Sequence, residues 1–270
     1  MRPRRSGGDV EANARVFAEL FSFNLPARVN FVGGGGKTSL ILELAREYSD
    51  WVQVLYTTTT RIHPPPAAEG RVLLSGDEPA LLASALERIA RDCPASARTL
   101  VVTSGLHSPG LLKGVEPGFT RSLDPASFPL VLNEADGARG VSLKLPRAGE
   151  PVLMEGADTL VAVIGLDCLM RPLGPTTLFR WELAAPRLGL TEGEALTPER
   201  AAAILLHPEG VCKDWRPPCR IVPFINKVDR DADVPMALEL ARALRASPTF
   251  PVERVLWGSV EQGRAGAWPD

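Results

Sequence analysis

Cysteine, histidine and long apolar runs are scarce in this sequence. The four cysteines among 270 residues are too scattered for a disulfide framework, and no two have the Cys-x-x-Cys spacing. The three histidines are far apart in sequence, so zinc ligation is not expected and a reducing compartment is the simplest setting. No stretch approaches the ~18 uninterrupted apolar residues that a membrane helix needs.

An excess of charge of one sign is also lacking. The formal net charge of −2 gives no reason to expect a nucleic-acid or membrane partner. The N-terminal stretch has arginines but no apolar run behind them, so we expect no signal peptide and a cytoplasmic protein. Hydrophobic residues make up 45% and charged residues 23% of the chain, which is typical of a soluble globular protein.

Apolar runs alternate with helical patterns along the chain. Strands are predicted at 28–32, 52–60, 71–75, 98–105, 128–137, 158–167, 220–229 and 252–259. Helices are predicted between them, at 10–21, 37–48, 78–91, 198–206 and 235–246. Because the strands show no polar alternation, we expect a mostly parallel sheet covered on both faces. We expect a disordered tail at 1–9 and a single domain over 10–270, with a small hairpin excursion between 66 and 127.

The stretch VNFVGGGGKTSL (29–40) resembles a shortened phosphate loop. The usual pattern, Gly-x4-Gly-Lys-Ser/Thr, ends here in Gly36-Lys37-Thr38, but Phe31 stands where its first glycine belongs. A shorter loop can still direct backbone N–H groups and a helix N-terminus at phosphate oxygens. Lys37 would then contact the β- and γ-phosphates, and the Thr38 hydroxyl would bind Mg²⁺. The expected nucleotide-binding residues of the loop are Gly33, Gly34, Gly35, Gly36, Lys37, Thr38 and Ser39.

These features predict an α/β, three-layer P-loop NTPase-like fold with a mostly parallel sheet. The alternative for the loop is a flexible glycine turn followed by an ordinary helix.

The stretch INKVD (225–229) matches the Asn-Lys-x-Asp element that reads guanine in GTPases. A carboxylate at Asp229 accepts hydrogen bonds from guanine N1–H and the 2-amino group, a donor pair that adenine lacks. Asn226 would reach the base edge and the phosphate loop, and the stem of Lys227 would cover the ring. The alternative is a polar strand-to-helix turn. Pro223 in this strand predicts an edge position in the sheet.

The stretch NEADG (133–137) places two carboxylates after a buried strand. Glu134 and Asp136 are therefore candidate Mg²⁺ ligands together with Thr38, and candidate catalytic residues together with Lys37. The alternative is a carboxylate that caps the following turn, since Asp and Gly are common turn residues.

Seven strings of the sequence, taken in order, carry a resemblance to a known family: FVGGGGKTS, LYTTTTRIHPP, EADGARGVSLKLP, EPVL, VIGLDCLMRPL, LLHPEGVCK and INKVD. They resemble the YqeC family, over roughly residues 28–260. That family is described as accessory or selenium-cofactor proteins for selenium-dependent molybdenum hydroxylases. The resemblance implies a P-loop nucleotide-binding protein whose loop is short throughout the family. It also implies a partner among molybdenum or selenium hydroxylases or their cofactor-insertion proteins.

The chain departs from the family pattern at three positions. Gly149 and Phe179 stand where that pattern commonly has histidine, so no role of those histidines is carried over. Cys168 stands where a small apolar residue is usual. Two interpretations remain for Cys168, Cys212 and Cys219, selenium or metal handling and buried structural thiols, of which the second is commoner.

Three functions remain open on this sequence. The first is a Mg²⁺-dependent purine nucleotide protein, with GTP expected ahead of ATP, that hydrolyses the nucleotide as a switch or maturation factor. The second is an ATP-dependent small-molecule kinase in cofactor synthesis, and the third is a nucleotide-gated scaffold without turnover. No acceptor site or arginine finger is evident in the sequence, so hydrolysis and phosphate transfer both stay open.

Overall fold

The computed structural model describes residues 15–68, 71–92 and 99–269. The tail expected at 1–9, the first part of the helix expected at 10–21, and Cys93 lie outside the described residues.

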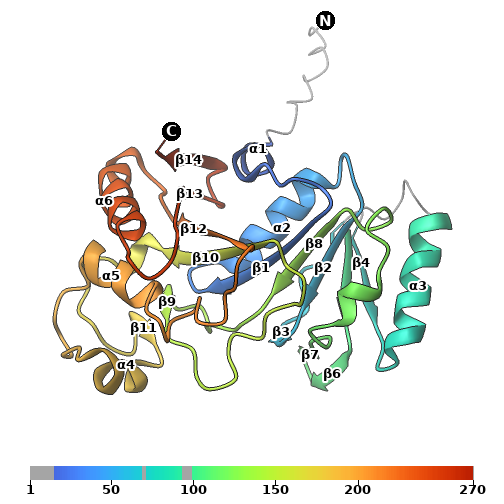
Figure 1. Cartoon of the computed structure of the whole chain (residues 1–270), viewed down its shortest axis with the longest axis horizontal. Coiled ribbons are helices and arrows are strands. Elements are labelled where there is room, and N and C mark those ends of the chain that lie inside the picture. Colours follow the sequence, from blue (N-terminus) through green and yellow to red (C-terminus); the bar gives the residue numbers. More distant parts are fainter. Residues whose placement is uncertain (1–14, 69–70, 93–98, 270) are drawn as a thin grey trace, which may run out of the picture.

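Within the described residues, a nine-stranded sheet forms the centre of the molecule (Figure 1). Its strands lie in the order β14-β13-β12-β10-β1-β8-β2-β5-β4, and all neighbours are parallel except β13 and β14. In that order their bounds are Arg264–Trp268, Val255–Ser259, Arg220–Asn226, Thr159–Gly165, Ala27–Gly33, Leu130–Glu134, Val54–Thr58, Thr99–Thr103 and Arg71–Ser75. The expected α/β architecture with a mostly parallel sheet is confirmed.

Helices cover both faces of this sheet. The α-helices are α1 (Val16–Phe21), α2 (Lys37–Tyr48), α3 (Pro79–Asp92), α4 (Trp181–Leu188), α5 (Pro198–Leu205) and α6 (Val234–Arg245). Short 3₁₀ helices are η1 (Phe119–Ser122), η2 (Leu166–Cys168) and η3 (Asp231–Asp233). In the part of the chain that the structure describes, no helix combines the length and apolar character needed to cross a bilayer.

Strand β10 shows why both faces are buried. Its Leu160 and Ala162 pack in one apolar cluster with residues of α5 and α6, whereas Val161 and Val163 pack in another with residues of α2. Successive side chains of a strand point to opposite faces, so a strand covered on both sides is apolar throughout. This is the reason that the apolar runs lack polar alternation.

Two small sheets lie outside the central one. Strands β3 (Arg61–Ile62), β7 (Leu111–Lys113) and β6 (Gly105–Ser108) form an antiparallel sheet, and β9 (Leu143–Lys144) pairs with β11 (Leu178–Phe179). The small hairpin expected between 66 and 127 is present as β6 and β7. Strands β4 and β5, which lie in the same span, belong to the central sheet.

The edge position predicted from Pro223 is also wrong. Strand β12 lies between β10 and β13, and Pro223 is in register with Ala162 of β10. On the other side, pairing with β13 covers only Phe224 and Ile225. Pro223 thus lies just before that pairing begins, where its missing N–H is tolerated as it is at an edge.

Candidate functional site

The glycine loop joins β1 to α2 at the carboxyl end of the sheet. Gly33, Gly35 and Gly36 have φ angles of 96°, 77° and 111°, a region that side chains rarely adopt. A Cβ atom on Gly35 would lie 2.2 Å from the backbone nitrogen of Gly165, so the loop packs directly on the end of β10. The glycines are therefore needed for a tight, fixed turn.

The loop's amides fall into two groups. Gly33 N–H donates to Asp136 Oδ2 at 3.1 Å, Gly34 N–H to Val163 O at 2.9 Å and Gly35 N–H to Val141 O at 3.2 Å. These three amides make hydrogen bonds that shape the loop, and Gly34, Gly35 and Gly36 all line the cavity described below. No acceptor within the described residues takes the amides of residues 36–39, which open helix α2.

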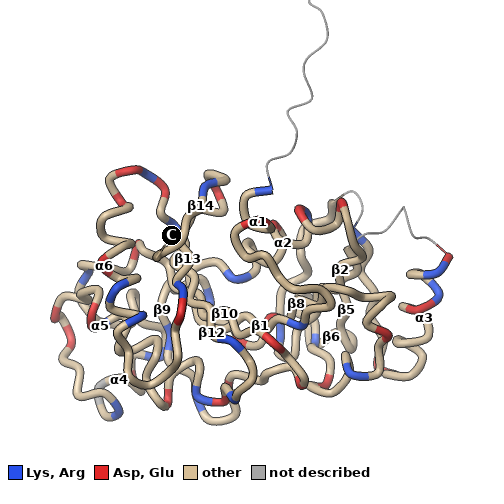
Figure 2. The backbone as a smooth tube through the Cα atoms, turned by 45° about the horizontal axis from the view of Figure 1, so that its top comes forward, with Lys and Arg blue, Asp and Glu red and all other residues tan. Residues whose placement is uncertain are grey.

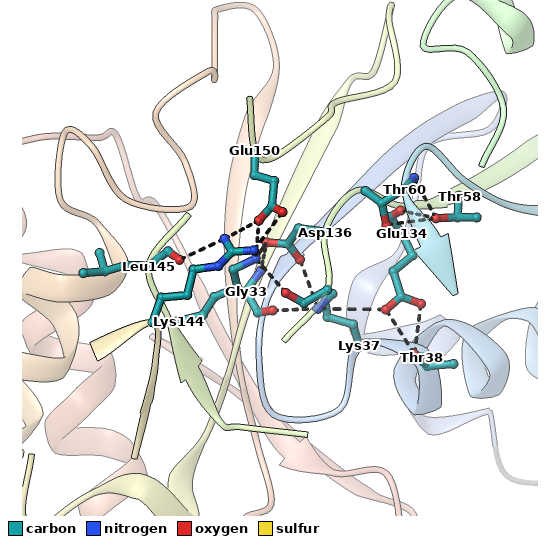
Figure 3. A network of polar contacts seen from close by, with 12 residues as sticks. Gly33, Lys37, Thr38, Thr58, Thr60, Glu134, Asp136, Lys144, Leu145 and Glu150 are labelled. Carbon is teal, nitrogen blue, oxygen red and sulfur yellow. Dashed lines mark hydrogen bonds and ion pairs between the residues drawn. The ribbon is translucent and has the colours of Figure 1, made fainter. Parts of the chain in front are cut away.

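Lys37 is turned back into the protein (Figure 3). Its Nζ donates to Gly33 O at 2.6 Å and lies 3.0 Å from Asp136 Oδ1 and 3.9 Å from Glu134 Oε1. The side chain is only 4% exposed. Contact with a phosphate in front of the loop would require Lys37 to leave Gly33 and Asp136.

Asp136 lies between two lysines. Its side chain is fully buried, and its Oδ2 lies 3.1 Å from Nζ of Lys144, which is itself fully buried. With Gly33 N–H and Lys37 as further partners, Asp136 organises the loop from behind and does not line the cavity described below. The structure therefore does not bring Asp136 to the metal position for which it was predicted.

The ion pairs continue from Lys144 to Arg180, the residue before α4. Lys144 Nζ lies 3.2 Å from Glu150 Oε2 (Figure 3). Both terminal nitrogens of Arg180 bind that carboxylate, at 2.5 and 2.8 Å. Arg147 adds a contact of 2.9 Å. Burial raises the pKa of Glu150, but the hydrogen bond from Arg180 and the charge of Lys144 outweigh it and bring the pKa to about 2.

Thr38 and Glu134 form a separate oxygen-rich pair. The Thr38 hydroxyl lies 2.9 and 3.1 Å from the two carboxylate oxygens of Glu134, and the Tyr56 hydroxyl donates to the same carboxylate at 3.0 Å. Burial and the charge of Glu134 raise the pKa of Tyr56 well above its usual value. Strand β8, which ends at Glu134, pairs directly with β1. Thr38 and Glu134 both line the cavity and supply the hard oxygen donors that suit Mg²⁺.

The expected base-reading residues lie at the end of β12 and just after it, and they contact the glycine loop through Asn226. Asn226 Nδ2 donates to Gly35 O at 2.8 Å, and its Oδ1 accepts from Val260 N–H at 3.2 Å. Lys227, with φ 63°, donates to Ser142 and Asp167. The predicted contact of Asn226 with the loop is therefore present.

Asp229 is exposed at the end of this element. Its Oδ1 accepts a hydrogen bond of 2.6 Å from the hydroxyl of Ser259, the last residue of β13. Ser259 thus orients the carboxylate, and Oδ2 has no hydrogen-bond partner within the described residues.

A cavity of about 1580 Å³ opens in front of the loop. Its lining includes the glycine loop with the start of α2, the small sheet of β3, β6 and β7, residues 137–141, and residues 147–150 with Phe179 and Arg180. Its charged lining is Lys37, Arg61, Lys113, Arg139, Arg147 and Arg180 against Glu116, Glu134, Glu150 and Glu182. Asn226, Lys227 and Asp229 are not part of the lining.

A family model described as "YqeC protein" matches residues 29–182. The chain is also 30% identical over 259 residues to "Uncharacterized protein YqeC" of Escherichia coli (strain K12), a match that covers 94% of each chain. The chain belongs to the YqeC family. A search of the solved structures gave no significant match.

The YqeC family match includes the loop and the whole ion-pair chain but ends before Asn226. Gly149 and Phe179 both line the cavity.

Sequence reasoning missed Lys144, Glu150, Arg180 and Tyr56 as members of the site. Lys144 had a usable signal, because a lysine between Leu143 and Leu145 in a short apolar run is unusual unless its charge is paired. The ion pair between Glu150 and Arg180 had no signal in the sequence, because the two residues are thirty positions apart.

Three cysteines lie within the described residues, and all three are free thiols. Cys168 and Cys212 are buried in the apolar cluster around β10, and Cys219 packs against it. Burial raises the pKa of Cys168 to about 12 and that of Cys219 to about 11, and it raises that of Cys212 as well. No group of three His, Cys, Asp or Glu side chains within the described ranges is placed to hold a metal ion.

Proposed function

We propose that this chain is a P-loop NTPase-like protein that binds a purine nucleotide with Mg²⁺ at the glycine loop, GTP ahead of ATP. One observation carries the proposal: the open amides of residues 36–39, Lys37 and the Thr38–Glu134 pair line the same cavity. Amides at a helix N-terminus favour phosphate, and an adjacent lysine adds positive charge.

Thr38 and Glu134 would hold the metal ion, which supplies charge neutralisation to the phosphates. Lys37 would exchange Gly33 O and Asp136 for phosphate oxygens, while Lys144 continues to neutralise Asp136. In this proposal the buried position of Lys37 belongs to the ligand-free protein, and the side chain moves out to contact phosphate when the nucleotide binds.

The preference for GTP rests on Asp229. Because Ser259 occupies only Oδ1, the carboxylate retains acceptor capacity for the N1–H and 2-amino donors of guanine. Asn226 ties this element to Gly35, so base and phosphate subsites would be held at a fixed separation. Through the family, we further propose a role as maturation or accessory factor for a selenium or molybdenum hydroxylase.

A small-molecule kinase is the second candidate, and the volume of the cavity favours it. At about 1580 Å³ the cavity exceeds the roughly 300–1,000 Å³ that one small ligand occupies, so an acceptor could bind beside the phosphates.

The test is calorimetric titration of GTP and ATP, each with Mg²⁺, into the wild type and Lys37→Ala. Charge-assisted hydrogen bonds contribute about 1.5–3 kcal/mol, so affinity should fall by about tenfold to a hundredfold. Arg254→Ala is the matched control, because Arg254 is exposed at the opposite, amino-terminal end of β13. A folded Lys37→Ala protein with undiminished affinity for both nucleotides would contradict the proposal.

The base is tested by competition. GTP should displace a labelled nucleotide at lower concentration than ATP, and Asp229→Asn should shift the preference toward xanthosine triphosphate, whose 2-oxo group accepts from an amide. Equal affinities in both proteins would mean that residues 226–229 only support the loop, and tighter ATP binding would favour the kinase.

A further inference from the structure

The base-reading element is not part of the cavity lining. Lys37, Thr38 and Glu134 line the cavity, whereas Asp229 does not. A nucleotide whose base reaches Asp229 and whose phosphates reach Lys37 would therefore leave the rest of the cavity vacant. This step rests on the proposed function, because it takes the direction of the nucleotide from it.

Two arginines of the cavity wall stack on Phe179. The Phe179 ring has the guanidinium carbon of Arg180 at 4.9 Å and that of Arg139 at 5.8 Å from its centroid. Such stacking fixes a guanidinium in orientation while its N–H groups stay available to an anion. Phe179 thus holds two guanidinium groups at the same wall.

The three arginines of this wall differ in how far their charge is compensated. Arg180 is 14% exposed and bound to Glu150 through two hydrogen bonds, and Arg147 is 65% exposed with a single contact to the same carboxylate. Arg139 is exposed and makes no ion pair or hydrogen bond within the described residues. Glu150 already serves Lys144 as well, so it cannot neutralise the wall.

The positive charge is local to the cavity. Lys, Arg, Asp and Glu are mixed along the backbone as a whole, as Figure 2 shows, and the chain carries a net charge of −2. The cavity lining has six basic and four acidic side chains, the opposite balance. A concave surface with an excess of one sign concentrates ligands of the other sign.

We propose that Arg139 and Arg180, which stack on Phe179, form a second ligand subsite with Arg147, which shares Glu150 with Arg180. This subsite takes a small molecule that carries a phosphate or carboxylate group. Guanidinium groups bind the two oxygens of such groups in a planar, paired geometry. The ligand occupies the cavity together with the nucleotide, and Arg139 supplies the charge that is not already compensated.

The test uses the full chain saturated with Mg²⁺ and a GTP analogue that resists hydrolysis, so that the loop cannot take the probe. Inorganic phosphate and succinate are titrated separately and followed by amide chemical shifts. We expect binding of at least one of them, with at least tenfold weaker affinity in Arg139→Glu and Arg139→Gln. Arg254→Glu, the same charge change at the other end of the sheet, should bind like the wild type. Which probe binds distinguishes a phosphate site from a carboxylate site.

Lys37→Ala separates this inference from the proposed nucleotide site. Anion binding that survives in Lys37→Ala but is lost in Arg139→Glu supports the subsite even if no nucleotide binds to the wild type. Anion binding that is lost in Lys37→Ala and retained in both Arg139 variants would place the probe at the loop and overturn the inference. The absence of binding by both probes in the wild type would overturn it as well.

Discussion

Replacement of Asp136 by asparagine should destabilise the protein strongly. The substitution keeps the shape of the side chain and an oxygen for Gly33 N–H, but it removes the negative charge between Lys37 and Lys144. Those lysines are 4% and 0% exposed, so water cannot replace the carboxylate. Loss of one partner from a buried ion pair costs about 3–5 kcal/mol.

The surroundings place the expected loss at the lower end of that range. Glu134 lies 3.9 Å from Lys37 and Glu150 lies 3.2 Å from Lys144, so each lysine keeps one carboxylate nearby. We therefore expect about 3 kcal/mol. In a chain of this size that corresponds to a fall in Tm of about 6–12 °C.

Urea denaturation and thermal unfolding of the Asp136→Asn protein measure this loss. The matched control is Asp167→Asn, which breaks the ion pair between Lys227 and Asp167. These side chains are 33% and 44% exposed, so the loss should cost less than about 1 kcal/mol of stability. If Asp136→Asn loses no more stability than Asp167→Asn, the buried charges do not depend on one another as the distances indicate.

Two further predictions concern pH and the packing of the loop. Glu150 has a folded pKa of about 2, below the ordinary 4.5, so its contribution to stability is complete above pH 4.5 and is lost as the pH falls toward 2. Glu150→Gln should therefore be less stable than the wild type at pH 7 and lose less stability between these pH values in urea titrations; parallel pH profiles would refute this. Gly35→Ala should destabilise the protein by at least about 2 kcal/mol more than Gly140→Ala. The two glycines have similar φ angles, 77° and 80°, but only at Gly35 would the added Cβ clash with backbone, at 2.2 Å from the nitrogen of Gly165. Equal losses in thermal unfolding would show that backbone conformation, and not the contact with Gly165, makes Gly35 necessary.

The sequence predicted the elements of the sheet interior well, because burial on both faces leaves long apolar runs. It failed where the local signal is weak. Helix α4 includes Pro186, which argues against a helix, and β14 is built of RAGAW, in which small residues hide the strand. Pro223 misled for a related reason, since the extent of pairing with β13 is not a local property.

The site divides in the same way. The phosphate-loop pattern specifies residues at short spacings, so the sequence indicated Gly36-Lys37-Thr38 and Glu134 as candidates, and the structure places them along one cavity. The role of Asp136 was misplaced, because the choice between a metal ligand and a partner for lysine depends on Lys144, which reaches it only after β9 has folded beside the loop. Buried ion pairs of this kind are set by tertiary contacts and leave no periodic trace in sequence.

The hydrogen bond from Asn226 to Gly35 also has a consequence for synthesis of the chain. The two residues are 191 positions apart, so the ribosome must add nearly two hundred residues before the loop meets this partner. At about 5–20 residues per second, the interval is about 10–40 s. During that time the nascent loop lacks the contact that ties it to β12. Full assembly of the loop must therefore wait until most of the chain has been translated.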